Sequence, residues 1–419
     1  MDSREQATVR WTHPVCILVY FLIAGAGWFG LISIDALGVS ARAVLTIAII
    51  PFVLVYLIPV VRNLTSYARW VLGFFLALCF WSLLEIMLHG ITSAGFQYVS
   101  VILISGSLLI LASYYVPRGV ELETFIAAVR YASLLALLFW GVQAAVAGFT
   151  LTGGRLGALA LSLLLPFLIF TSRGWRTISS WALPSAISLG VVASSARAAT
   201  MVVVLSWLVA GFARRREIVG AIRRQTPLTR AVLFGLTVGF TALAAAAFVT
   251  GGYLDRLTKG DQAFTLGPLV LNTEGRGNVW GQLLTETGQT GVFGGGIGYS
   301  QNFLANSGTG WEHPHNEFLR LYLDYGILGL GLFLAILLVP LVYCIRALRA
   351  EPSRKNPAWV GVLTVAGILV FMLVDNPLAY VSATPPAAFL IGLCCTLAQS
   401  QSWWFVLERE PVPQDLEEH

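Results

Sequence analysis

The chain has 419 residues, of which 57% are hydrophobic and only 11% are charged, and its mean hydropathy is +0.77. Soluble globular chains carry about 25% charged residues, so this composition excludes that class and indicates a polytopic membrane protein. The net charge of +5 does not indicate a nucleic-acid-binding protein, because the cytoplasmic loops of membrane proteins are enriched in Lys and Arg. The five cysteines all lie in apolar segments, which argues against a disulfide framework.

Apolar segments of membrane-spanning length recur along the chain. A bilayer core of about 30 Å needs roughly 20 apolar residues per helix, and this criterion predicts an all-α fold with about twelve transmembrane helices. The sixth and eighth are short and the junction between the seventh and eighth is tight, so these helices are expected to be either tilted or broken near Arg197. The predicted spans are 14–34, 41–61, 70–88, 96–115, 121–149, 156–171, 177–196, 198–213, 229–250, 319–345, 357–375 and 384–406.

The basic residues predict the orientation of these spans. If both termini are cytoplasmic, most Lys and Arg fall in inside loops, as the positive-inside rule requires. Arg130 then lies within the fifth span. The basic residues left on the outside are Arg42, Arg155, Arg197, Arg256, Lys259, Arg276 and Arg320.

The predicted organisation has four parts. Residues 1–250 hold the first nine transmembrane helices, 251–318 form a long outside loop, 319–406 hold the last three helices, and 407–419 form a cytoplasmic tail. Loops of this length between helices are usually functional. Within the loop, 276–287 has apolar residues at helical spacing, which predicts a short helix at the membrane interface.

Two histidines, His313 and His315, end the outside loop. Pro314 between them favours an extended or turn geometry, so the two side chains are expected to point in different directions. Asn316 can cap the following helix, with Glu317 in its first turn. A histidine at the rim of a membrane cavity can act as a general base near neutral pH. The residues alone leave open whether these histidines are catalytic or simply cap a helix start.

Three of the outside arginines lie in short motifs: Arg155 in GGRLG, Arg197 in SSARAAT and Arg276 in TEGRGN. Guanidinium groups bind phosphate oxygens in a bidentate manner, so arginines that converge on one side of the membrane suit a diphosphate. The alternative is that each arginine pairs with a local carboxylate, such as Glu274 or Asp375, or extends to water.

Three further motifs have simpler interpretations. GGGIGYS at 294–300 lacks the GK[ST] of a phosphate-binding loop, so nucleotide binding is rejected. The glycines of GILGLG at 326–331 predict close helix packing. Glu85 and His89 are four residues apart and can pair with each other. HPHNE does not have the spacing of a zinc motif, so we expect no metal and no cofactor.

Together these motifs resemble the O-antigen ligase and polymerase superfamily, which are multispan glycosyltransferases of the bacterial inner membrane. The resemblance rests first on HNEFLRLYLDYGILGLGLF at 315–333, which follows a long loop that ends in GGGIGYS. It extends over roughly 155–333. The supporting motifs, in the expected order, are GGRLG at 153–157, SSARAAT at 194–200 and GRGNVW at 275–280.

The resemblance implies a role for each matched residue. His315 would be the catalytic base, and Arg276, Arg197 and Arg155 would bind the diphosphate of an undecaprenyl-diphosphate-linked glycan. The resemblance gives His313 no counterpart; from their position in the same segment, the candidates for supporting residues are His313, Asn316, Glu317 and Arg320.

The resemblance also implies a reaction: O-antigen ligation, the transfer of a glycan en bloc to a sugar hydroxyl of lipid A-core. It would take place on the periplasmic face of the inner membrane, among membrane lipids, with inversion and without a metal. Eleven residues separate Arg276 from Gly288, where some polymerases of the superfamily have ten, which favours a ligase. The alternatives are a repeat-unit polymerase with the same site, transfer to a protein acceptor, and a lipid-linked glycan transporter.

Overall fold

The computed structural model describes residues 13–26, 35–36, 39–115, 120–147, 153–172, 179–194, 196–215, 264–266, 269–271, 275–308, 310–311, 313–349 and 355–399. Within them the chain is helical, apart from two antiparallel pairs of very short strands. The helices of the first half are α1 (Pro14–Gly25), α2 (Ala41–Val60), α3 (Ser66–His89), α4 (Ser93–Leu111), α5 (Val120–Ala147), α6 (Gly153–Phe170), α7 (Ser179–Ala193) and α8 (Arg197–Ala213). Those of the second half are α12 (Arg276–Thr290), α13 (Tyr299–Asn306), α14 (Glu317–Leu348), α15 (Lys355–Val374) and α16 (Thr384–Gln399). The short elements are η1 (Val61–Asn63), η3 (Pro377–Ala379), β1 (Asp35–Ala36), β2 (Val39–Ser40), β3 (Phe264–Leu266) and β4 (Leu269–Leu271).

Apolar helices coincide with eleven of the twelve predicted spans, and the remaining one, 229–250, lies outside the described residues. Among the described residues, five helices are long and apolar enough to cross a membrane: Thr46–Asn63, Ser66–His89, Glu121–Ala145, Glu317–Leu348 and Lys355–Val374. Of the two predicted alternatives, tilted helices or a break near Arg197, the break is present, because α7 ends at Ala193 and α8 begins at Arg197. The total of twelve spans, the orientation of the termini and the extent of the outside loop stay predictions.

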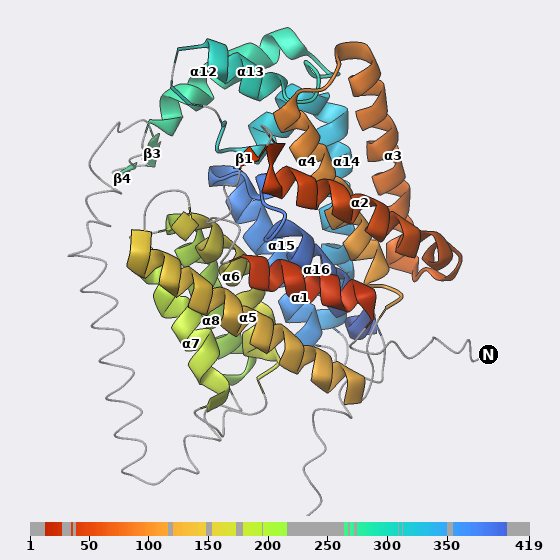
Figure 1. Cartoon of the computed structure of the whole chain (residues 1–419), viewed down its shortest axis with the longest axis vertical. Helices are drawn as coiled ribbons and strands as arrows, with labels where there is room; N and C mark the ends of the chain where they lie inside the picture. Colours follow the sequence, from red (N-terminus) through yellow and green to blue (C-terminus); the bar gives the residue numbers. More distant parts are fainter. Residues whose placement is uncertain are drawn as a thin grey trace, which may run out of the picture.

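Helices α15 and α16 lie at the centre of the bundle, between α5–α8 on one side and α3, α4 and α14 on the other (Figure 1). From Thr384 to Ala398 every residue of α16 is buried. A helix that is apolar all round belongs in such a position. Gly392 allows a close approach here, since a Cβ on it would lie 2.3 Å from the carbonyl oxygen of Leu109 in α4.

A sharp kink interrupts α14 at Gly326, which has φ 68° and ψ −174°. The turn after α12 uses this kink, because the N–H of Ile327 donates to the Val292 carbonyl (3.1 Å) and that of Gly295 to the Leu323 carbonyl (2.7 Å). Only glycine fits, since a Cβ at 326 would lie 1.9 Å from the Val292 oxygen. The prediction that GILGLG serves helix packing therefore holds for Gly329, where a Cβ would lie 3.3 Å from the Trp81 ring of α3. It does not hold for Gly326, nor for Gly331, where a Cβ would meet no described residue outside the helix backbone within 4 Å.

Helices α12 and α13 form a layer across the end of the bundle at which α14 begins (Figure 1). The predicted helix at 276–287 is thus confirmed as α12. A small apolar core fixes the layer: Val279 and Leu283 of α12 pack with Leu304 of α13 and Leu323 of α14. This layer brings the start of α12 to the histidine loop and to the end of α15.

Candidate functional site

His315 has an unusual backbone conformation, with φ 49°, and it is the one non-glycine with positive φ among the described residues. Such a conformation costs about 1–2 kcal/mol for a side chain of this kind. Neighbouring contacts hold it: Trp280 Nε1 donates to the Pro314 carbonyl (2.9 Å), and the Asn316 side chain accepts from the N–H of Leu319 (3.1 Å). The second contact confirms Asn316 as the predicted cap of α14.

The His315 imidazole lies between an aromatic ring and a carboxylate. Its Nδ1 is 3.6 Å from Oδ1 of Asp375, and the two side chains are 21% and 20% exposed. This distance is slightly longer than a hydrogen bond and within the range of an ion pair. The Trp311 ring meets the imidazole edge to face, with centroids 5.4 Å apart. His315 is therefore oriented by its neighbours yet still reachable from solvent.

Asp375 directly follows α15, and its Oδ1 accepts a hydrogen bond from the N–H of Asn376 (2.8 Å). Burial acts to raise the pKa of this carboxyl, but contact with His315, the Asn376 N–H and the charge of Arg276 together hold its pKa below the ordinary value. Asp375 is thus ionised at neutral pH. The sequence analysis considered it only as a partner for an arginine; an acidic residue directly after an apolar span was the available signal.

Arg276 is the first residue of α12 and reaches the same place from a third segment. Its Nη1 donates to the carbonyl oxygen of Val374, the last residue of α15 (2.8 Å). Gly275 before it has φ 84° and lies against the Trp311 ring. Three segments of the chain therefore bring His315, Asp375 and Arg276 together. Asp375 is close enough to sense the charge of Arg276, whereas Glu274 lies outside the described residues.

Arg197 begins α8, at the end of the bundle where α15 ends. Leu163 of α6 and Val202 of α8 both contact Gly367 of α15, and Arg214 after α8 donates to the Phe170 carbonyl at the end of α6 (2.6 Å). Helices α6 and α8 therefore run parallel.

The direction of this pair follows from Phe167, one turn after Leu163. Thr384, at the start of α16, donates a hydrogen bond to the Pro377 carbonyl of η3, so this end of α16 is near the site. Phe389 is further along α16 and therefore further from the site. Phe125 contacts both Phe389 and Phe167, so Phe167 also lies on the side of the bundle away from the site. The starts of α6 and α8 thus point toward the site. Arg155 is the third residue of α6, and its side chain lies outside the described part of the chain.

His313 and His315 point in different directions, as predicted. Their rings are perpendicular, with centroids 6.3 Å apart, and Nδ1 of His313 pairs with Nε2 of Gln301 in α13. His313 therefore contacts the α12–α13 layer while His315 faces Asp375. At the same end of the bundle, Glu85 and His89 form the predicted pair, at 2.9 Å.

Glu317 and Arg320 are fully buried in an ion network at the start of α14. Arg320 is bonded to Glu317, lies 3.5 Å from Asp324 and stacks over the Tyr98 ring at 3.7 Å. Glu317 accepts from the N–H of Leu378 (3.2 Å), and Asp324 accepts from that of Ser300 (2.8 Å). The sequence analysis counted Arg320 among the outside arginines and did not predict that its side chain is buried. The network joins the segment after Asp375 and helix α13 to the helix that follows His315.

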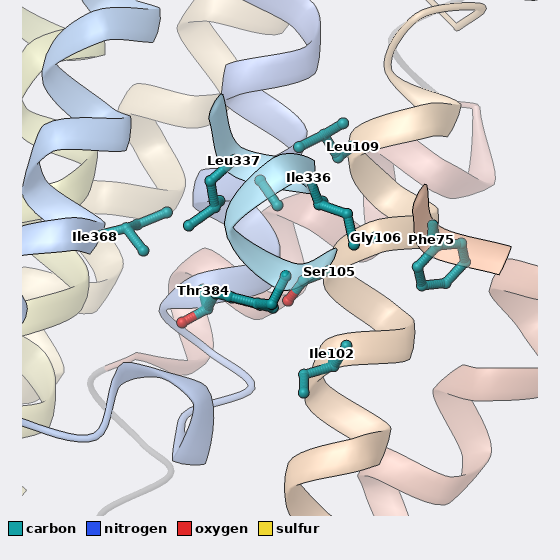
Figure 2. A pocket seen from close by; sticks show the side chains of 11 residues that line it. Phe75, Ile102, Ser105, Gly106, Leu109, Ile336, Leu337, Ile368 and Thr384 are labelled. Atoms are coloured by element: carbon teal, nitrogen blue, oxygen red, sulfur yellow. The ribbon is translucent and has the colours of Figure 1, made fainter. Parts of the chain in front are cut away.

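A small apolar cavity lies away from these residues, between α3, α4, α14, α15 and α16 (Figure 2). Its volume of about 20 Å³ suffices for one water molecule. The Ser105 hydroxyl, which is buried without a hydrogen-bond partner among the described residues, is on its lining. The cavity is too small for a sugar and does not compete with the site around His315.

Part of the chain is similar to a known protein family. A family model described as O-antigen ligase matches residues 182–334, a segment that includes Arg197, Arg276 and His315. No curated protein matches the chain. Members of this family are membrane glycosyltransferases, and the apolar helices of the chain agree with a multi-pass membrane protein. At residues 182–334 the chain therefore carries a domain of the O-antigen ligase superfamily.

Proposed function

We propose that this protein is an O-antigen ligase, which transfers a glycan en bloc from undecaprenyl diphosphate to a sugar hydroxyl of lipid A-core on the periplasmic face of the inner membrane. One observation carries the proposal: an ionised carboxylate, a strained histidine and an arginine meet at the end of a bundle that carries an O-antigen ligase domain.

His315 is the general base in this reaction. Its imidazole takes the proton from the acceptor hydroxyl as that oxygen attacks the anomeric carbon. Asp375, 3.6 Å from Nδ1, orients the ring and stabilises the imidazolium that forms, so Nε2 is the nitrogen that accepts the proton. The oxygen attacks from the face opposite the leaving group, and the configuration at the anomeric carbon is inverted.

Arg276 and Arg197, with Arg155, bind the diphosphate and stabilise the charge that develops on it as the glycosidic bond breaks. Arg276 and Arg197 are the first residues of α12 and α8, where the helix dipoles add further positive potential. Because a diphosphate is already a good leaving group, the reaction needs no general acid. The arginines supply positive charge that a metal ion supplies in other transferases.

The deciding experiment is the banding pattern of lipopolysaccharide from cells that lack this gene and receive wild-type, His315→Asn or His89→Gln copies. Asparagine tolerates positive φ, so His315→Asn removes the base without disturbing the backbone. His89→Gln is a matched control at the same end of the bundle. Ligation predicts that wild type and the control restore long bands, while His315→Asn leaves lipid-linked polymer to accumulate.

Two other patterns would change the assignment. Bands with a single repeat unit still attached to core, in cells without the gene, would show that ligation is intact and that the protein polymerises repeat units. Full restoration by His315→Asn would show that the histidine is structural, and the base mechanism would be wrong.

A further inference from the structure

One face of α12 carries a row of uncharged polar side chains. Asn278, Gln282, Thr285 and Gln289 follow at spacings of four, three and four residues, so they share one side of the helix. All four are exposed, whereas Val279 and Leu283 on the other side are buried against α13 and α14. We call these four residues the amide row.

The layer that carries the amide row has almost no charge. From Arg276 to Trp311 the sequence contains two charged residues: Arg276 lies in the site, and Glu286 is bonded to the Tyr299 hydroxyl. The exposed polar side chains of α13 are Asn302 and Asn306, again uncharged. A water-facing protein surface normally mixes Lys, Arg, Glu and Asp.

Helix stability does not explain this composition. Gly, Asn and Thr are among the weaker helix formers, yet α12 contains Gly281 and Gly288 in its interior beside the row. Both glycines are exposed, and apart from the helix backbone no atom of the described residues lies within 4 Å of the position that a Cβ on either would take. Because these glycines have no side chains, the helix backbone beside the amide row is uncovered, and a flat sugar ring can lie against it.

The amide row starts at the site and leads away from it. Asn278 is two residues after Arg276, and at a rise of 1.5 Å per residue the row extends for about 16 Å. A sugar chain whose diphosphate is held at Arg276 would therefore pass along the row. The Thr285 hydroxyl donates to the Gly281 carbonyl (3.0 Å), so it offers its acceptor side to the outside.

We propose that the amide row binds the sugar chain of the donor, and that this chain is an electrically neutral glycan. The inference rests on the proposed function, because it places the diphosphate at Arg276. Amides both donate and accept hydrogen bonds, as sugar hydroxyls do. An anionic glycan would instead be matched by Lys or Arg along its path.

The test uses the double variant Gln282→Ala/Gln289→Ala of the full-length protein in proteoliposomes. The control is Asn63→Ala. Asn63 is an exposed amide in η1, just before α3, and so lies at the end of α3 that is far from the site. Donors are lipid-linked glycans extracted from cells lacking the gene and a synthetic undecaprenyl diphosphate with the first sugar alone. The double variant should raise KM for the long donor about tenfold, as expected for two lost hydrogen bonds. Its kcat, and KM for the one-sugar donor, should match wild type.

The outcomes separate the two proposals. An equal KM for variant and wild type on the long donor overturns the amide row but leaves ligation intact. Wild-type protein that transfers neither donor overturns both proposals. Sugar analysis of the accumulated lipid-linked glycan supplies a second test, because uronic acids or phosphate in its repeat unit would overturn the assignment of a neutral chain.

Discussion

Replacement of Gly326 by alanine is expected to detach the turn after α12 from α14. The backbone at this position, φ 68° and ψ −174°, belongs to a region that costs a side chain about 1–3 kcal/mol. The Cβ would lie 1.9 Å from the Val292 oxygen, so the bonds from Ile327 to Val292 and from Gly295 to Leu323 would break. At about 1 kcal/mol each, these losses bring the total to about 3–5 kcal/mol.

Gly331→Ala is the matched control, five residues further along the same helix. Apart from the helix backbone, no atom of the described residues lies within 4 Å of the position that a Cβ on Gly331 would take, so alanine should be neutral or stabilising by up to about 1 kcal/mol. The assay is thermal unfolding of the purified variants in detergent, combined with transfer activity. The turn links α12 to α13, so its release should also displace Arg276. If Gly326→Ala has the same Tm and the same transfer activity as wild type, this account of the turn is refuted.

Four further predictions concern three residues of the site. Asp375→Asn should lower kcat at least about tenfold with little change in KM, and an unchanged kcat would exclude a role in orienting His315. The pKa of Asp375 is lowered in the folded protein, so its carboxylate stabilises the fold above the ordinary carboxyl pKa, and this stabilisation is lost as the pH falls through the lowered value. The Tm of Asp375→Asn should therefore fall less steeply than that of wild type as the pH is lowered. The same dependence of Tm on acidic pH in both proteins would contradict this. Arg276→Lys should raise KM for the donor about tenfold because the planar donor pair is lost, and wild-type kinetics would remove Arg276 from the diphosphate site. His315→Gly should be inactive yet more stable by about 1 kcal/mol, since glycine adopts φ 49° without cost; a lower Tm would show that the imidazole contributes more by packing than its backbone costs.

Local patterns in the sequence predicted much of the architecture. Apolar runs located eleven of the helices because the length needed to cross a bilayer is fixed by its thickness. The cap at Asn316 and helix α12 followed from capping chemistry and periodicity over a few residues. Each of these signals is contained within one short segment.

Contacts between distant segments were not predictable in the same way. The pairing of His315 with Asp375 depends on how α14 and α15 pack, and the burial of Arg320 depends on Tyr98 in α4. The kink at Gly326 becomes meaningful only when the turn at Val292 lies against it. No property of the separate segments encodes these contacts, so glycine at 326 was indistinguishable from glycine that serves helix packing.

The bond between Glu317 and Leu378 joins positions 61 residues apart, and it has a consequence for biosynthesis. A ribosome synthesises α14 completely, and then α15, before the segment that carries Asp375 and Leu378 exists. Until that segment emerges, Glu317 lacks one of its partners and His315 lacks its carboxylate. Under the proposed mechanism, the nascent chain therefore cannot act on lipid-linked glycans while α14 and α15 are being inserted, and activity begins only after the segment with Asp375 and Leu378 has been translated and packed against α14.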